Sequence, residues 1–512
     1  MKRLFFIVAF LLLGHAFLWA QSPAKYWVQF TDKQESPYSI DRPLEYLSPK
    51  AIENRKAFRI PITESDLPVN PQYISKVTAL DSEMIVFTRS KWLNGITIYS
   101  EKDSIIELMR QLPFVQYCEK TITLKKPEKA LESPYIYPHA GKTPVPQLPT
   151  TSELDYGKGE KQIRLNNVHW LHRMGYKGEG MTMIVMDAGF LNADSIPQFK
   201  KLRDENRILG VKNFVRPDVD PFRKDSHGTT VLSCIAADVP GELIGSAPYV
   251  MVYLARTEDS RSENVVEEDN WVAGIEWADS LGCKVLNSSL GYTKFDDTLQ
   301  VRTYKDLNGE TSRASRAATI AASKGMIVCN SAGNEGRGKW KHIGSPADAN
   351  DILSIGATND EGKKASFSSF GPTADGRIKP DAAAVGEMTY SATSIGTIGR
   401  TNGTSLSSPL FSGMVVCLWQ AFPHKSNFEI MDAIRRSGNQ ADKPNDSLGY
   451  GITDFLKAYN LLLGEENEKE KFTVRFKSYT TESNQMMMPF FLLRGYLFEY
   501  HRKSTRNRST FD

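Results

Sequence analysis

Residues 184–189 read Ile184-Val185-Met186-Asp187-Ala188-Gly189, and this stretch sets the fold class of the chain. The apolar run 181–186 predicts a buried strand, and Asp187 follows it directly in a Gly-containing turn. Similar strand-like runs recur further along the chain, at 250–254, 284–286, 326–328 and 352–355. Apolar residues at helical spacing lie between them, as at Trp271, Ile275, Ala278 and Leu281. The alternation predicts an α/β domain with a mostly parallel, doubly wound sheet and helices on both faces, whose functional site lies at the carboxyl ends of the strands.

Composition and periodicity divide the 512 residues into five predicted segments. They are a signal peptide (1–20), a small α+β domain (21–126), a Pro-rich linker (127–160), the α/β domain (161–464) and a tail without an assigned role (465–512). The basic residues Lys2 and Arg3, followed by the apolar run 4–13, indicate the signal peptide. The protein is therefore expected to be secreted or periplasmic.

The composition excludes several classes of protein. With 63 basic and 60 acidic side chains the formal net charge is +3, so the sequence gives no general attraction to nucleic acid. No apolar run beyond the signal peptide is long enough for a stable membrane span. The five cysteines are isolated in the sequence, which predicts buried thiols rather than a dense disulfide framework.

Four polar residues stand in Gly-containing turns at the end of a predicted strand or the start of a predicted helix: Asp187, His227, Asn334 and Ser405. A serine hydroxyl is a weak nucleophile until an imidazole removes its proton, and a carboxylate holds that imidazole in the correct tautomer. The tetrahedral intermediate then needs hydrogen-bond donors for its oxyanion. The four residues therefore supply the groups needed for acyl transfer. Ser405 opens a predicted helix, and Pro409 is expected in the first turn of that helix, where proline is tolerated.

Simpler interpretations exist for such residues, because single polar residues in Gly-rich turns are commonly turn formers or helix caps. His169 and His172, three residues apart on a predicted helix, show the spacing of a metal-binding pair, but no third ligand lies nearby in the sequence. We therefore predict no metal site. The segment 402–404 matches a glycosylation acceptor, yet it lies inside the Ser405 motif and is interpreted as part of it.

The order Asp187, His227, Ser405, together with these local motifs, resembles the subtilisin-like serine proteases over about residues 163–463. The resemblance implies a serine endopeptidase with these three residues as its catalytic triad. It also implies that the Asn334 side chain donates a hydrogen bond to the oxyanion.

The region before the α/β domain resembles the inhibitory prodomain of the same family, which implies a ferredoxin-like fold and a precursor that processes itself. Ser289, Leu290 and Gly291 match the family segment that lines the cleft and pairs with the peptide as a strand. The expected partners are a protein or peptide substrate and the chain's own prodomain, and the chemistry needs no cofactor. Family members often bind calcium, but a full ligand set cannot be matched in this sequence.

Two positions depart from the family pattern. Ala188 stands where a hydroxyl residue usually follows the triad aspartate, and Leu406 stands where a methionine usually follows the serine. Ala188 removes a hydrogen bond that would orient Asp187. Two other functions stay open at this point: a catalytically silent peptide-binding protein with the same fold, and an esterase or acyltransferase acting on non-peptide esters. The prodomain-like region favours peptides over small esters, and the intact triad argues against a silent protein.

Overall fold

The computed structural model describes residues 23–124, 153–469, 490–493 and 496–499. The predicted signal peptide, most of the predicted linker and much of the predicted tail lie outside the described residues. The chain divides into two compact units, Met1–Leu462 and Leu463–Asp512. In the second unit, β16 (Phe490–Leu493) and β17 (Tyr496–Glu499) form an antiparallel hairpin.

The first unit begins with a small domain built on an antiparallel sheet of four strands in the order β2-β3-β1-β4. Its elements are β1 (Ala24–Phe30), α2 (Pro49–Ala57), α3 (Pro71–Thr78), β2 (Ile85–Ser90), β3 (Gly95–Ser100), α4 (Ile105–Arg110) and β4 (Val115–Thr123). Asn94, with a φ of 51°, turns the chain between β2 and β3, as an Asn-Gly pair favours in a hairpin. The strand order and the helices confirm the predicted ferredoxin-like arrangement.

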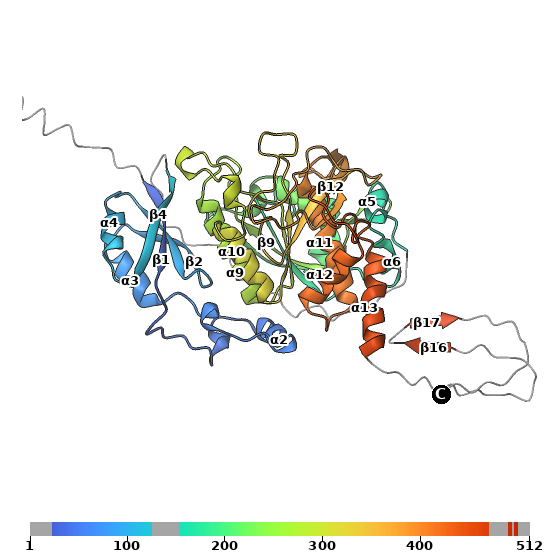
Figure 1. The fold of residues 1–512 in the computed structure, drawn as a ribbon, viewed down its shortest axis with the longest axis horizontal. Helices are drawn as coiled ribbons and strands as arrows, with labels where there is room; N and C mark the ends of the chain where they lie inside the picture. The colour runs from blue at the N-terminus through green and yellow to red at the C-terminus, as the bar shows by residue number, and fades with distance from the viewer. Residues whose placement is uncertain (1–22, 125–152, 470–489, 494–495, 500–512) are drawn as a thin grey trace, which may run out of the picture. The chain divides into compact units, whose positions relative to one another are not determined.

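One part of this domain departs from the simple ferredoxin-like pattern. Between β1 and α3 the chain leaves the sheet over residues 31–70 and forms α2 and two short 3-10 helices, Pro43–Glu45 and Glu64–Asp66. Figure 1 shows α2 away from the small sheet. In the ferredoxin-like pattern a helix alone would connect the two strands, so residues 31–70 are an insertion into that fold.

The rest of the first unit is built on a sheet of seven strands in the order β13-β12-β11-β10-β5-β9-β6, and every neighbouring pair in it is parallel. The strands are β5 (Thr182–Asp187), β6 (Ile208–Asn213), β9 (Met251–Arg256), β10 (Val285–Ser288), β11 (Ile327–Ser331), β12 (Leu353–Thr358) and β13 (Ala382–Val385). The chain order reverses at β5, which lies between β9 and β10. This is the place in a doubly wound sheet where ligands bind.

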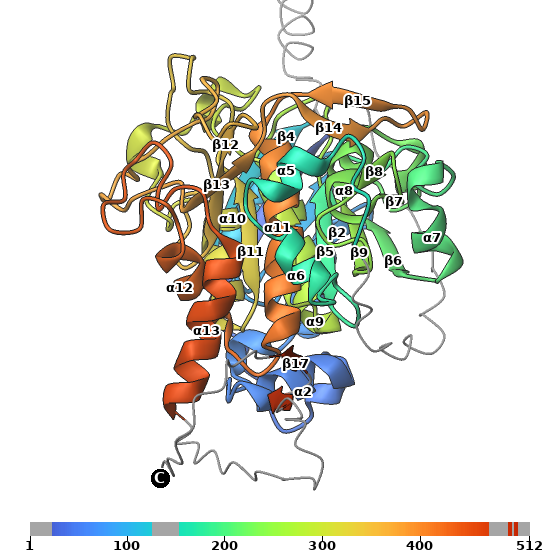
Figure 2. The ribbon, with the colours of Figure 1, turned by 90° about the vertical axis from the view of Figure 1, so that its right-hand side faces the viewer.

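Helices cover both faces of this sheet, which confirms the predicted class. The main ones are α8 (His227–Ala236), α9 (Val266–Leu281), α10 (Arg313–Ser323) and α11 (Thr404–Ala421). Figures 1 and 2 show α9 and α10 on the face nearer the small domain and α11 on the opposite face. The remaining elements are α5 (Glu160–Arg164), α6 (His169–Arg173), α7 (Lys200–Asp204), α12 (Asn427–Arg436), α13 (Phe455–Lys469) and the hairpins β7 (Asp238–Val239) with β8 (Leu243–Ile244) and β14 (Thr389–Ala392) with β15 (Ile398–Thr401).

The small domain shares a hydrophobic core with the larger one. Trp27, Trp92 and Leu93 of the small domain lie in one cluster of buried side chains with Trp271 and Ile275 of α9. The small sheet is therefore held against α9 by apolar burial. Within the described residues, no helix has the length and apolar character that a membrane span requires.

The predicted position of Pro409 is wrong. Because α11 begins at Thr404, Pro409 lies in the second turn and removes a helical hydrogen bond to the carbonyl oxygen of Ser405. That oxygen instead accepts a hydrogen bond from Ser289 Oγ at 3.0 Å. The proline is tolerated because a neighbouring strand end replaces the missing donor.

Candidate active site

Asp187 is the last residue of β5 and is fully buried. Its Oδ1 accepts hydrogen bonds from Ala188 N at 2.8 Å and is 2.8 Å from His227 Nδ1. Its Oδ2 is buried and has no hydrogen-bond partner among the described residues. The methyl side chain of Ala188 offers no donor to that oxygen, which agrees with the bond expected to be missing there.

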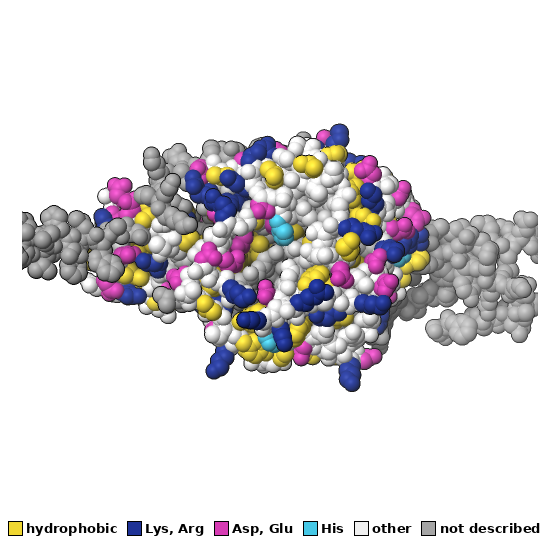
Figure 3. All heavy atoms as spheres, turned by 90° about the horizontal axis from the view of Figure 1, so that it is seen from above, with side chains coloured by type: hydrophobic (Ala, Val, Ile, Leu, Met, Phe, Trp, Pro, Cys, Tyr) yellow, Lys and Arg dark blue, Asp and Glu magenta, His cyan; other side chains and the backbone are white. Residues whose placement is uncertain are grey.

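His227 is the first residue of α8, and its side chain is 39% exposed. Gly228 allows this helix to approach the end of β5, because a Cβ there would lie 2.2 Å from Gly189 O. The attraction of the Asp187 carboxylate for the imidazolium raises the pKa of His227 to about 9, and burial opposes part of that shift. Figure 3 shows several Asp and Glu side chains gathered near the middle of the face that it draws.

Ser405 lies in the first turn of α11, where backbone N–H groups have no partner inside the helix. The residue is 9% exposed. The helix packs against α8 and against β10, β11, β12 and β13, which brings its amino end to the carboxyl edge of the sheet. No hydrogen bond joins Ser405 Oγ to His227 in the described structure, and such bonds are often long before a substrate is bound.

Asn334 follows β11 and is exposed, and its side chain is oriented by the start of α11. Its Oδ1 accepts hydrogen bonds from Thr404 N at 2.9 Å and from Thr404 Oγ1 at 3.1 Å. The amide oxygen accepts both hydrogen bonds, so the NH2 group of the side chain points away from Thr404. Asn334 is thereby linked to Thr404, the residue that precedes Ser405.

The segment of Ser289, Leu290 and Gly291 leaves the carboxyl end of β10. Ser289 is buried and holds the Ser405 carbonyl, whereas Gly291 is exposed. Within the described part of the chain, the N–H groups of Leu290 and Gly291 bond to no main-chain carbonyl, and regular pairing resumes with Tyr292 N to Ser345 O at 2.7 Å. The segment thus offers two backbone N–H groups next to Ser405, whereas Leu290 O already accepts a hydrogen bond from Asn330 Nδ2 at 3.1 Å.

A group of acidic residues near this edge was missed by the sequence reasoning. Carboxylate oxygens of Glu258, Glu263 and Glu267 lie within 4.8 Å of one another. Glu258 accepts a hydrogen bond from Tyr292 OH at 3.1 Å, and burial first, then repulsion within the group, raises the pKa of Glu263 to about 8. Burial also raises the pKa of Glu267 to about 7. The three residues lie close together in the sequence, before and at the start of α9, and this proximity could have indicated the cluster. Acidic side chains in such a segment are, however, usually solvated.

His169 and His172, the pair with the spacing of metal ligands, both lie buried on α6. His172 Nδ1 is 2.7 Å from Tyr156 OH, and its Nε2 is 3.0 Å from the carbonyl oxygen of Ser246. Burial lowers the pKa of His172 to about 3. Both ring nitrogens are therefore used within the fold.

Comparison with known proteins gives the family. The profile of the subtilase family, Peptidase S8, matches residues 178–451, and that of the Bacteroidota S8 propeptide domain matches 25–133. The chain belongs to the subtilase family and carries an N-terminal S8 propeptide domain, as the resemblance predicted.

The chain is also similar to individual subtilisins. It is 29% identical over 268 residues to subtilisin NAT of Bacillus subtilis subsp. natto and to subtilisin E of Bacillus subtilis strain 168, covering 52% of this chain. The match spans 62% of the length of either relative. Among solved structures, the MycP3 protease from the type VII (ESX-3) secretion system aligns with a TM-score of 0.47 and 20% identity, over 61% of this chain and 90% of that one.

Proposed function

We propose that the chain is an exported serine endopeptidase, made as a precursor with an inhibitory N-terminal domain. The observation that carries the proposal is the 2.8 Å contact between His227 Nδ1 and Asp187 Oδ1 at the carboxyl edge of the sheet, where α11 also presents Ser405. Membership of the subtilase family supports the same reaction class.

In the proposed reaction, Ser405 Oγ attacks the carbonyl carbon of the scissile peptide bond while His227 Nε2 accepts its proton. Asp187 fixes the tautomer through Nδ1 and stabilises the imidazolium. The imidazolium then gives the proton to the leaving amine, and water hydrolyses the acyl-enzyme by the same route. Asp187, His227 and Ser405 carry out these steps without a cofactor.

Hydrogen-bond donors must stabilise the negative charge that forms on the carbonyl oxygen. The NH2 group of Asn334, the Ser405 N–H and the positive end of the α11 dipole would supply them. The N–H groups of Leu290 and Gly291 would bind the peptide backbone and add it as a strand. Backbone pairing of this kind suits a polypeptide rather than a small ester.

We place the export signal at 1–20, the inhibitory domain at 21–126, the linker at 127–160 and the catalytic domain at 161–464. The propeptide match at 25–133 supports the second of these assignments. In this arrangement the N-terminal domain inhibits the enzyme, and cleavage in the linker releases it.

Labelling with a fluorophosphonate probe, together with hydrolysis of a denatured protein substrate, tests the proposal. The wild type should be labelled at Ser405 and should cleave the protein, and Ser405→Ala or His227→Ala should each reduce cleavage to near background, because the two groups act as one unit. Asn334→Ala should keep the label while turnover falls by ~10²–10³.

The remaining outcomes separate the other two functions. A folded wild type that takes no label but binds peptides would be a silent binding protein. A labelled protein that hydrolyses esters and leaves peptides intact would be an esterase. Normal turnover by Ser405→Ala would show that the nucleophile is misassigned.

A further inference from the structure

Residues 31–70, hereafter the anchor segment, begin and end at the same place on the small domain. Asn70 Nδ2 donates to Gln34 O at 2.6 Å, and Lys33 Nζ donates to Leu67 O at 2.6 Å. Leu47, Ala51 and Ile52 form a separate small hydrophobic cluster within the anchor segment. It is therefore an insertion with its own small hydrophobic cluster, closed by hydrogen bonds between its two ends.

The anchor segment contacts the C-terminal ends of α9 and α10, where the last carbonyl groups of each helix have no partner within the helix. Ser48 N donates to Ser280 O at 2.8 Å, and Asn54 Nδ2 donates to Gly282 O at 2.9 Å, so both cap α9. Arg55 Nη1 donates to Lys324 O at the end of α10. Three donors of the anchor segment thus satisfy carbonyl groups at two helix ends.

The fit at these ends is close. Gly282 has a φ of 81°, and a Cβ there would lie 2.8 Å from Ala51 N. Gly325 has a φ of 91°, and a Cβ there would lie 2.7 Å from Ile60 Cδ1. The glycines that end α9 and α10 are therefore both covered by the anchor segment.

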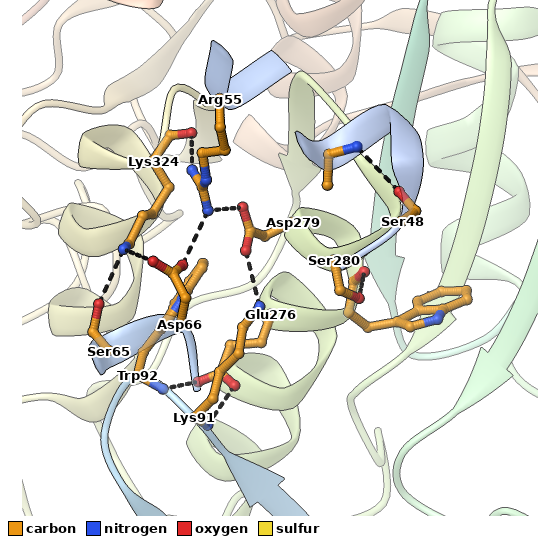
Figure 4. Close-up of polar contacts among 12 residues, drawn as sticks. Ser48, Arg55, Ser65, Asp66, Lys91, Trp92, Glu276, Asp279, Ser280 and Lys324 are labelled. Carbon is orange, nitrogen blue, oxygen red and sulfur yellow. Dashed lines mark hydrogen bonds and ion pairs between the residues drawn. The ribbon is translucent and has the colours of Figure 1, made fainter. Parts of the chain in front are cut away.

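A buried ion network fixes the same contact, as Figure 4 shows. Arg55 Nη2 lies 2.7 Å from Asp279 Oδ1 and 3.3 Å from Asp66 Oδ1. Lys324 Nζ lies 2.6 Å from Asp66 Oδ2, and Lys91 Nζ lies 3.0 Å from Asp279 Oδ2. Arg55 and Asp66 are 3% and 0% exposed.

The charges of this network are complementary across the boundary between the two domains. Arg55, Lys91 and Asp66 lie on the N-terminal side, and Asp279, Lys324 and Glu276 lie on the catalytic side, where Glu276 accepts hydrogen bonds from Lys91 N and Trp92 N. Each side therefore carries one unbalanced charge of opposite sign. Removing one partner from such a network leaves a buried charge without compensation.

We infer that the anchor segment is a second attachment, distinct from the ferredoxin-like domain, that recognises the ends of α9 and α10 and keeps the N-terminal part bound after the linker has been cut. The inference rests on the proposed function, in which the linker is cleaved. Two connected attachments release more slowly than either alone, because one rebinds while the other holds. The surface formed by Asp279, Ser280, Gly282 and Lys324 is thus the docking site for this chain's own anchor segment.

The test uses the full chain carrying Ser405→Ala, with the recognition sequence of an added specific protease inserted within 127–152. After that protease cuts, the rate at which the N-terminal fragment leaves the immobilised catalytic fragment is measured. Arg55→Ala should speed release by roughly 100-fold or more, because Asp66 and Asp279 lose a buried partner. Lys56→Ala removes one exposed charge from the same helix and should change the rate less than about threefold.

Two further variants guard against misfolding. Asn54→Ala loses one neutral donor to Gly282 O and should speed release by about 2–10-fold. Replacing 35–66 by a short Gly-Ser link should release the fragment at least as fast as Arg55→Ala does. Release at the parental rate from the Arg55→Ala and the deletion variants would overturn the inference. Because cutting is done by another protease, the result does not depend on whether the chain is itself a peptidase.

Discussion

One carboxylate oxygen of Asp187 has hydrogen-bond partners and the other has none in the described structure. Its Oδ1 contacts His227 and Ala188 N, whereas the buried Oδ2 has no partner in the described structure. Hydrogen-bond donors offset part of the negative charge of a carboxylate. A carboxylate with fewer donors therefore attracts a neighbouring imidazolium more strongly. We therefore expect the residue after Asp187 to influence the pKa of His227.

Ala188→Thr should place a hydroxyl donor near Asp187 Oδ2 and lower the pKa of His227 by about half a unit or more. The acid limb of kcat/KM should then move to lower pH. Ala188→Val has nearly the same shape without the hydroxyl and is the matched control. Identical pH profiles for the two variants would show that no such bond forms.

The acid limb of the wild-type profile follows from the raised pKa of His227. The proposed reaction needs the neutral imidazole, and a pKa of about 9 means that the ring binds a proton as the pH falls through that value. We therefore expect kcat/KM to decline below about pH 9, well above the reference histidine value of ~6.5. A rate constant that stays flat down to about pH 6, below that reference value, would contradict His227 as the base.

At the scale of the element, α11 depends on a strand end for its integrity. Pro409 leaves the Ser405 carbonyl without its helical donor, and Ser289 Oγ replaces that donor at 3.0 Å. The same residue that begins the proposed substrate segment thus holds the first turns of the helix that carries Ser405. Under the proposed function, this bond couples the position of Ser405 to that of the segment that would bind the substrate.

Ser289→Ala should leave the buried carbonyl unsatisfied and lower the unfolding free energy by about 1–3 kcal/mol. Pro409→Ala restores an N–H that can bond to the same carbonyl, so it should recover most of that loss in the double variant. Thermal unfolding of all variants in a Ser405→Ala background, which avoids self-digestion, measures the coupling. Additive effects of the two substitutions would show that they do not share an acceptor.

For the whole molecule, the proposed function predicts that the chain cuts itself. Wild-type protein should be cleaved between about 125 and 161, and Ser405→Ala should accumulate uncut after removal of the signal. Mass spectrometry of both proteins, made in a host without other active proteases, reads out the cut. Equal cleavage of both would mean that another protease matures the chain.

The parallel α/β domain, the ferredoxin-like domain and the family could be predicted from the sequence. Several strands of the larger domain are short apolar runs, as at Thr182–Asp187 and Met251–Arg256, and such a run can be recognised without knowing its neighbours in the fold. The ferredoxin-like fold of the small domain was implied by the family resemblance. The four motif residues were recognisable because each depends on a turn that only a few residue types can form. The second-turn position of Pro409 was not recognisable, since helix starts are uncertain by a residue or two.

The sequence by itself determined which residues carry the proposed chemistry, because their types and their order along the chain are local facts. Tertiary structure alone decided that Ser289 supports α11, that Asp187 Oδ2 is left without a donor, and that Arg55 reaches Asp279, 224 positions away. Such contacts join residues that share no periodicity, and their burial depends on how whole domains pack. A buried charge is stable only where partners from several elements meet, so its role cannot be read from any one segment.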